Sequence, residues 1–273
     1  MTGHGTSYGA ISVLNAIPCG IGSTIGIDLR TDVTFEPRDG PVDIRLIDRP
    51  GLGDRLVRTC VRRTLERIGE PADIGYLLTC RTDIPPSRGL KSSSSVCNAT
   101  ICAVLDHFGK NMDDMDIVRL GVECAIECKV TITGAFDDAC GCHLNGLVVT
   151  DNGRRELLSR GVLPRYDVLI YSPREMITKD RVDVSKYRAM ADLYNELAHR
   201  IREDPLGVLT DNGRAVAGII GMSNDLAEDA LRKGALAAGV SGTGPAVAIV
   251  CEPGDGDRMQ KELNIDAMRC HVR

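Results

Sequence analysis

The chain has 273 residues, enough for one large or two medium domains. Its formal net charge is −5 and its Lys and Arg residues form no block, which argues against nucleic acid as the main partner. No apolar run approaches the roughly 18 residues of a membrane span, and the N-terminus lacks a secretory pattern. We therefore expect a cytoplasmic protein that does not bind membranes.

In the first half of the chain, alternating residues predict a strand at 25–35, with 42–47 as its hairpin partner across the turn at 37–41. An amphipathic helix is predicted at 54–68, followed by a strand at 74–82. Further elements are expected as helices at 92–107 and 112–128 and a strand at 144–150. The triplet Asp151-Asn152-Gly153 then indicates a hairpin turn.

The second half begins with a predicted strand at 166–172. Three predicted helices follow, at 186–202, 206–218 and 224–238. The chain then closes with an apolar strand at 246–250, a short helix at 257–263 and a strand near 268–272. A strand–helices–strand–helix–strand order is typical of a split, ferredoxin-like α+β domain.

The most informative segment is Pro85–Ser95, PPSRGLKSSSS, which joins a predicted strand to a helix of small residues. A helix that starts in Gly and Ser presents free N–H groups and the positive end of its dipole, which favours phosphate. Gly89 permits close backbone approach to a ligand, and Lys91 adds a positive charge. The alternative interpretation is a Ser-rich N-terminal cap on a buried helix.

The eleven cysteines are scattered, and none forms a C-x-x-C pair. We expect them to be small buried hydrophobic residues in a reducing cell rather than metal ligands.

Two further segments accompany the Ser-rich loop. Residues 131–139, TITGAFDDA, place two Asp after a bend at Gly134, and residues 239–247, GVSGTGPAV, form a Gly-rich turn. Phosphoryl transfer needs a phosphate site, a cation and a group that orients or deprotonates the acceptor hydroxyl. The loop, a metal-binding Ser with a Glu, and an Asp would supply these three requirements.

These segments resemble the motifs of the GHMP small-molecule kinases. Pro85-x-x-x-Gly89-Leu90-x-Ser92-Ser93 is similar to the central motif, Gly242-Thr243-Gly244-Pro245 to the C-terminal motif, and Thr133-Gly134-Ala135-Phe136-Asp137 to the segment with the catalytic Asp. Within the family, Leu14–Leu29, GLKSSSS and TGAFDDA are close to the archaeal-type shikimate kinases.

The resemblance implies a two-domain α+β fold. Residues 1–153 would form an N-terminal domain like ribosomal protein S5, with the ATP loop and the catalytic Asp. Residues 154–273 would form the C-terminal ferredoxin-like domain. ATP and Mg²⁺ would bind between them, and the 3-hydroxyl of shikimate would be phosphorylated by a monomer or homodimer.

The resemblance also assigns residues. Asp137 would be the base or would orient the hydroxyl, with Asp138 as the competing candidate, and Ser93 would be a Mg²⁺ ligand. The expected ATP-binding residues are Pro86, Ser87, Arg88, Gly89, Leu90, Lys91, Ser92, Ser93, Ser94 and Ser95 in the loop, with Gly242, Thr243 and Gly244 in the C-terminal motif.

Two departures from the family pattern leave roles open. The segment Leu14–Leu29 has no basic residue before it, so we expect Lys91, or else Arg88, to supply the catalytic cation. The family spacing for the metal-binding Glu falls on Ala125, between Glu123 and Glu127, and we favour Glu127 as the second Mg²⁺ ligand.

Three alternatives remain. One is a kinase for another small alcohol such as homoserine or mevalonate, and another is a catalytically inactive metabolite sensor of the same fold. The third, a nucleotide-binding structural protein, depends only on the anion loop.

Overall fold

The computed structural model describes residues 1–48, 51, 53–131, 134–173 and 183–273. Thr133 of the predicted catalytic segment lies outside the described residues. In the N-terminal part the elements are β1 (Gly3–Leu14), β2 (Ile21–Pro37), β3 (Asp43–Leu46), α1 (Arg55–Ile68), β4 (Tyr76–Thr82), α2 (Ser92–His107), α3 (Asp114–Glu127), α4 (Phe136–His143), β5 (Leu147–Asp151) and β6 (Glu156–Gly161). The remaining elements are β7 (Asp167–Tyr171), α5 (Val184–Arg188), α6 (Ala191–Arg200), α7 (Pro205–Ile220), α8 (Asp225–Arg232), β8 (Ala237–Val240), β9 (Val247–Cys251), α9 (Gly256–Leu263) and β10 (Met268–His271).

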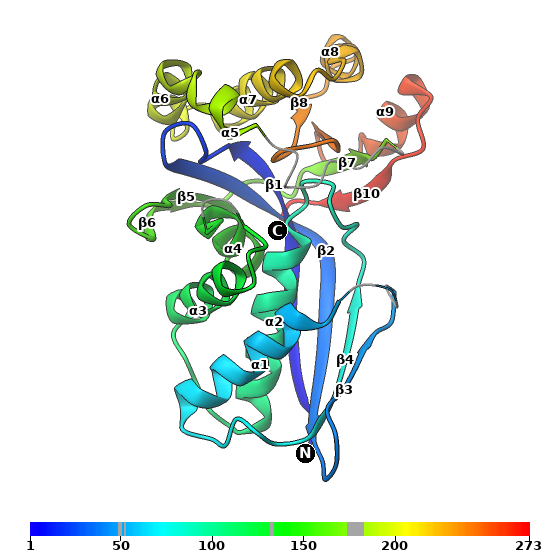
Figure 1. Cartoon of the computed structure of the whole chain (residues 1–273). Coiled ribbons are helices and arrows are strands. Elements are labelled where there is room, and N and C mark those ends of the chain that lie inside the picture. The colour runs from blue at the N-terminus through cyan, green and yellow to red at the C-terminus, as the bar shows by residue number, and fades with distance from the viewer. Residues whose placement is uncertain (49–50, 52, 132–133, 174–182) are drawn as a thin grey trace.

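The first sheet is built around the long strand β2. β1 runs antiparallel along one edge of β2, while β4 and β5 share the other edge at its two ends. Helices α1 and α2 cover this sheet (Figure 1), and apolar side chains such as Val33, Phe35, Val61 and Leu65 fill the layer between them. Burial of these side chains is the main stabilising contribution to this part of the fold.

The predicted 25–35/42–47 hairpin is wrong. β3 does not pair with β2 but lies parallel to β4, with Asp43 opposite Leu77. β4 takes the place beside β2 that a hairpin partner would occupy, pairing antiparallel from Thr31 to Pro37. The chain therefore crosses through α1 between β3 and β4, as parallel pairing requires.

The second sheet has the strand order β10-β7-β9-β8, all antiparallel, with α7 packed on β8. This order, with helices between the first two and the last two strands, is the ferredoxin-like arrangement expected from the sequence. Two predicted helices were too long. The segment 186–202 divides into α5 and α6 at Met190, and α8 ends at Arg232, before Gly234 adopts φ +92° and the chain enters β8.

One apolar core joins the two sheets. Ile25 and Ile27 from β2 pack with Val168 and Ile170 from β7, and with Leu209 from α7. The two halves therefore meet through buried side chains, and in Figure 1 the helices α6, α7 and α8 lie at the opposite end of the molecule from α1. Among the described residues, no helix is both long and apolar enough to cross a membrane.

Candidate active site

A single hollow lies where the three sequence motifs meet. The loop after β4, the start of α4 and the turn between β8 and β9 all line it, although they are far apart in the sequence. Its described lining includes Pro85, Ser87, Gly89, Leu90, Lys91, Ser92, Ser93, Ser94, Asp137, Asp138, Gly242, Thr243 and Gly244, together with Asn15, Ala16, Ile17, Val130, Thr131 and Ala135.

Two glycines, Gly89 in the loop and Gly242 in the β8–β9 turn, lie where the loop contacts the turn. Gly89 has φ +80°, and a Cβ atom there would lie 2.0 Å from the carbonyl oxygen of Ser241. Gly242 has φ +62°, and its Cβ would lie 3.0 Å from Nζ of Lys91. A side chain is therefore excluded at Gly89, and the left-handed backbone at Gly242 favours glycine there.

The hydroxyl of Ser241 fastens this contact. It donates a hydrogen bond to the carbonyl oxygen of Gly89 at 2.9 Å and accepts one from the backbone N–H of Ser12 in β1 at 3.0 Å. The loop is thereby held between the first strand and the C-terminal motif. The start of α2, which follows this loop, is therefore held in place as well.

The start of α2 is open to a ligand. Lys91 precedes the helix in the left-handed conformation, with φ +67°, and its side chain makes no capping hydrogen bond. The side chains of Ser92, Ser93 and Ser94 line the hollow. The free N–H groups of a first helical turn and the positive end of its dipole suit an anion.

Lys91 instead directs its side chain toward α4. Its Nζ lies 2.9 Å from Oδ1 of Asp138 and donates to Oγ of Ser12 at 2.6 Å, and the side chain is only 5% exposed. Burial alone lowers the pKa of Lys91, but the carboxylates of Asp138 and Asp137 outweigh it and raise that pKa above its usual value. Lys91 is thus a fixed positive charge beside the two aspartates.

Asp137 occupies the first turn of α4 and is 5% exposed. Its Oδ1 accepts a hydrogen bond from Nδ2 of Asn152 at 2.7 Å, and its backbone oxygen accepts one from Thr24 at 3.0 Å. Burial, followed by repulsion from Asp138, raises the pKa of Asp137 to about 6. A carboxylate with a pKa near neutral is well matched to proton transfer at physiological pH.

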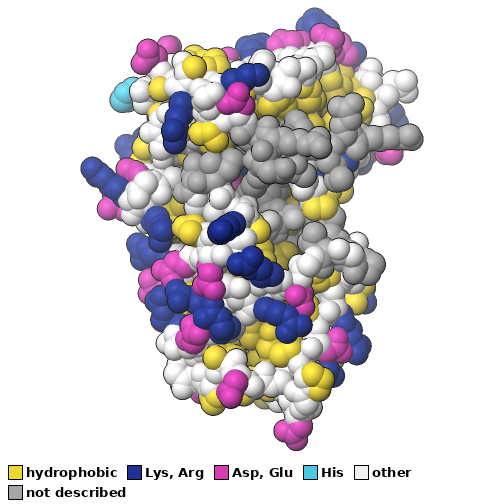
Figure 2. Space-filling model, in the orientation of Figure 1, with side chains coloured by type: hydrophobic (Ala, Val, Ile, Leu, Met, Phe, Trp, Pro, Cys, Tyr) yellow, Lys and Arg dark blue, Asp and Glu magenta, His cyan; other side chains and the backbone are white. Residues whose placement is uncertain are grey.

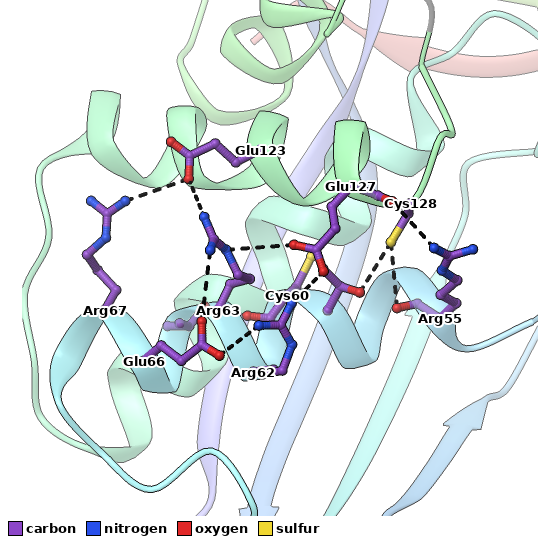
Figure 3. Close-up of polar contacts among 11 residues, drawn as sticks. Arg55, Cys60, Arg62, Arg63, Glu66, Arg67, Glu123, Glu127 and Cys128 are labelled. Carbon is purple, nitrogen blue, oxygen red and sulfur yellow. Dashed lines mark hydrogen bonds and ion pairs between the residues drawn. The ribbon is translucent and has the colours of Figure 1, made fainter.

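Glu127 does not lie in the hollow, so the prediction that it holds Mg²⁺ finds no support in its position. Figure 3 shows Glu123 and Glu127 directed from α3 toward the arginines of α1. Glu127 pairs with Arg62 and Arg63, and its side chain is 45% exposed. The family spacing falls on Ala125, which is buried in α3 next to Cys124, whereas the glutamates on either side of it face α1.

Glu123 is no better placed as a metal ligand. It accepts from Arg63 at 2.8 Å and lies 3.7 Å from Arg67. On the face in Figure 2, Lys/Arg and Asp/Glu side chains are intermixed over this lower part of the molecule. Both glutamates thus belong to a surface ion-pair network, which is the ordinary role of exposed helical charges.

Three of the predicted loop residues do not line the hollow. Pro86 is absent from its lining, the guanidinium of Arg88 donates to the carbonyl of Pro173, and Ser95 is fully buried in α2. The other predicted loop and turn residues line it. Their roles in binding stay predictions.

Three functional candidates escaped the sequence analysis. Ser12 holds the Lys91 ammonium, and Asn15 donates from Nδ2 to the carbonyl of Gly242 at 2.6 Å. Asn152 holds Asp137. Ser12 and Asn15 could have been identified because Ser12 lies just before the first motif, Leu14–Leu29, and Asn15 lies within it. Asn152 offered no such signal, because the sequence indicated only a turn residue there.

A second, smaller hollow adjoins the start of α2 on its other side. Its described lining is largely apolar, with Leu46, Leu56, Val57 and Val96, and it shares Ser92 and Ser93 with the first hollow. The two hollows therefore meet at the helix terminus that favours phosphate.

Comparison with known proteins agrees with this geometry. The family descriptions "GHMP kinases N terminal domain" and "GHMP kinases C terminal" match residues 55–146 and 195–267. A shikimate kinase of Methanothrix thermoacetophila is 41% identical over 94% of this chain and 88% of its own length. A shikimate kinase of Methanocella arvoryzae is 38% identical over 96% of this chain and 89% of its own length.

The fold is also that of a solved structure. The mevalonate kinase of Methanococcus jannaschii superposes with a TM-score of 0.79 at 16% identity, and the match covers 100% of this chain and 98% of that one. At that identity the likeness concerns the fold alone. Together with the two matching family descriptions and the relatives above 30% identity, it establishes that the chain belongs to the GHMP kinase family.

Proposed function

We propose that this GHMP kinase transfers the γ-phosphoryl group of ATP to the 3-hydroxyl of shikimate. One observation carries the proposal: a single hollow brings together the start of α2, the Lys91–Asp138 ion pair and the buried carboxyl of Asp137. Phosphoryl transfer requires such a combination of phosphate site, cation and proton acceptor. The choice of shikimate as acceptor is supported by the names of the relatives at 41% and 38% identity.

In this proposal the triphosphate of ATP lies across the loop and the first turn of α2. The apolar hollow beside Leu56 and Val96 then accepts the base, because it adjoins the phosphate site through Ser92 and Ser93. A flat, largely apolar ring system suits such a lining. Shikimate takes the part of the main hollow beside Asp137.

Mg²⁺ is the cation that usually accompanies ATP, and it prefers oxygen ligands while keeping several waters. Ser93 is the predicted ligand that lies in the hollow, and its hydroxyl suits this requirement. When bound, the ion neutralises part of the phosphate charge. Glu127 is left out of this assignment.

The chain's own residues perform the proton transfer. The ionised carboxyl of Asp137 accepts the proton of the 3-hydroxyl as the hydroxyl oxygen bonds to the γ-phosphorus. The bond from that phosphorus to the β–γ bridging oxygen breaks, and ADP leaves with the electron pair. Lys91, held by Asp138 and Ser12, supplies a fixed positive charge at this place in the hollow.

Three further assignments complete the proposal. We place the reaction in the cytoplasm, with a monomer or homodimer as the active species. We also move the domain boundary from residue 153 to the segment after Gly161, because β6 pairs with β5 in the first sheet.

An ADP-release assay with shikimate, homoserine and mevalonate as acceptors tests the function. We expect shikimate-dependent turnover, and Asp137→Asn should lower kcat by at least ~100-fold, the scale of a lost general base. Glu127→Gln is the matched control, since its carboxyl lies outside the hollow, and it should keep kcat within about 2-fold.

The other possible results of this assay would each change the proposed function. Turnover with homoserine or mevalonate in place of shikimate would reassign the acceptor, and no acceptor-dependent ADP release with any of them would favour a metabolite sensor. If Asp138→Asn loses turnover while Asp137→Asn keeps it, the proton acceptor is Asp138.

A further inference from the structure

Asn152 is buried although it belongs to a hairpin turn. It follows β5 in the turn that leads to β6 and is only 5% exposed. Turn asparagines commonly bond to their own local backbone. Here the backbone N–H of Asn152 donates to the carbonyl of Gly20 at 2.9 Å, which draws the turn inward.

Both the oxygen and the nitrogen of the Asn152 side-chain amide form hydrogen bonds. Its Oδ1 accepts from the backbone N–H of Asp137 at 3.1 Å and from the hydroxyl of Thr150 at 2.8 Å, while Nδ2 donates to Oδ1 of Asp137 at 2.7 Å. A backbone N–H is only a donor, so the amide oxygen must face it. The amide NH₂ is consequently committed to the carboxylate.

The opposite side of the Asp137 carboxyl is closed by backbone. A Cβ atom on Gly22 of β2 would lie 2.6 Å from Oδ2 of Asp137, so strand β2 leaves no room beside the carboxyl. Asn152 on one side and Gly22 on the other therefore restrict the carboxyl to one orientation. Few rotamers remain for a side chain confined in this way.

The charged and titratable groups around Asp137 come from two elements. Asp138 and Cys140 lie on α4 itself, and Lys91 reaches it from the loop before α2. From β2 and the turn after β5 the groups that face it are Gly22, Thr24 and Asn152, none of which titrates. The charge of Lys91, then the amide of Asn152 and the backbone N–H of Asp138, lower the pKa of Asp137 against the effect of burial and of repulsion from Asp138.

We propose that Asn152 is a positioning residue for phosphoryl transfer, which fixes the Asp137 carboxyl in one orientation and stabilises its ionised form. The catalytic part of this inference rests on the proposed function. The effect on the carboxyl is a property of the protein without substrates.

The test follows the Asp137 carboxyl directly, by ¹³C NMR titration of protein labelled at aspartate carboxyls. Asp137→Asn identifies the resonance by its loss. In Asn152→Ala we expect the midpoint to rise by about one pH unit, the value of one hydrogen bond to the ionised form. Thr150→Val, which removes only the hydroxyl that orients the amide, should move it in the same direction by less.

Turnover gives the second measurement. Asn152→Ala should lower kcat by about 10- to 100-fold and leave the KM for ATP within about 2-fold, because orientation and proton transfer act on chemistry rather than nucleotide binding. The acid limb of the pH–rate profile should move upward with the NMR midpoint.

Asn98→Ala is the matched control. Asn98 is also fully buried and also bonds α4, donating to the carbonyl of Ala139 at 3.0 Å, but it does not touch the carboxyl. We expect it to lower stability without moving either midpoint.

An unchanged carboxyl midpoint in both Asn152→Ala and Thr150→Val overturns the proposal, and so does a loss of kcat without movement of the acid limb. If Asn152→Ala does not fold, the midpoint of the Asp137 carboxyl titration in Thr150→Val still tests the proposal. An inactive wild-type protein would refute the proposed function instead, and the titration would remain interpretable.

Discussion

Asp137 must be ionised to accept a proton, yet the fold buries it beside a second aspartate. Burial and Asp138 raise its pKa from 3.8 to about 6, so its charged form is disfavoured in the folded protein. A folded-state pKa above the unfolded value means that protonation favours folding. The stability that this provides is present below about pH 3.8 and is lost as pH rises through about 6.

The first prediction follows from the direction in which folding shifts the pKa of Asp137. Asp137→Asn removes the buried charge, so at pH 7.5 its free energy of unfolding should exceed that of the wild type by up to about 3 kcal/mol. The difference should shrink as the pH falls and disappear below about pH 3, where Asp137 is protonated in both the folded and the unfolded state. Urea denaturation of both proteins across this range measures it, and a difference independent of pH would contradict the assignment of the raised pKa to Asp137.

At the scale of residues, sequence reasoning selected Asp137, Lys91 and Ser93 because each belongs to a compact motif, and all three line the main hollow, although their roles stay predictions. It missed Ser12 and Asn152, whose partners Lys91 and Asp137 are 79 and 15 residues away. Those contacts depend on how β1 and β5 pair with β2, which no local pattern encodes. The position of Glu127 outside the hollow was equally unpredictable, since spacing along a helix does not say which face turns toward the hollow.

At the scale of elements, several helices and strands were predicted close to their observed bounds, but the strand β8 was not. The helix predicted at 54–68 is observed as Arg55–Ile68, and the one predicted at 92–107 as Ser92–His107. In contrast, β8 reads AAGV, four small residues that continue an alanine-rich helical pattern. It becomes a strand because β9 pairs with it, and that is a tertiary effect.

The parallel pairing of β3 with β4 could not be predicted from the local sequence pattern either. The segments at 25–35 and 42–47 are separated by a turn with two prolines, which is a normal hairpin signal. The strand that pairs with β2 in place of β3 is β4, which follows α1 in the sequence. Its seven residues give β2 a longer antiparallel partner than the four residues of β3 could offer.

The contact between the loop and the β8–β9 turn leads to a second prediction. Gly89→Ala would place a methyl group 2.0 Å from the carbonyl oxygen of Ser241, so the loop must move away from the turn. We expect kcat/KM for ATP to fall by about 100-fold or more, the scale of a displacement of about 1 Å at a catalytic site.

Gly69→Ala is the control for backbone strain. Gly69 ends α1 with φ +77°, close to the +80° of Gly89, but a Cβ there meets no atom within 4 Å. It should lower stability by about 1 kcal/mol and leave kcat/KM unchanged. Steady-state kinetics of both variants separates loop displacement from strain, and equal losses in both would contradict the proposed loop contact.

At the scale of the whole molecule, the main hollow depends on both sheets. β1 and β2 of the first sheet hold Ser12 and Gly22, whereas the second sheet supplies the turn with Ser241 and Gly242. The shared core of Ile25, Ile27 and Leu209 keeps these parts together. The resemblance to the GHMP kinases implied that ATP binds between two domains, but the sequence did not show which contacts, such as those of Ser241 with Gly89 and Ser12, join the two parts.

The cysteines lie almost entirely within this packed interior. Nine of the eleven are buried, and Cys19 and Cys102 are half-buried. Hydrogen bonding to Cys124 and Cys97, together with burial, raises the pKa of Cys60 well above its usual value, and burial raises that of Cys102 to about 11. The thiolate is the reactive form, so native cysteines should react slowly even where a reagent reaches them.

Labelling with a chromogenic disulfide reagent at pH 8 therefore tests the integrity of the whole fold. We expect no more than two thiols per chain to react before unfolding, those of Cys19 and Cys102, and all eleven in denaturant. The double variant Cys19→Ser/Cys102→Ser should show no early phase at all, because the remaining thiols become accessible only when the core opens. Rapid reaction of three or more thiols in the folded protein would mean that part of the interior opens readily in solution, contrary to the burial of the other nine cysteines.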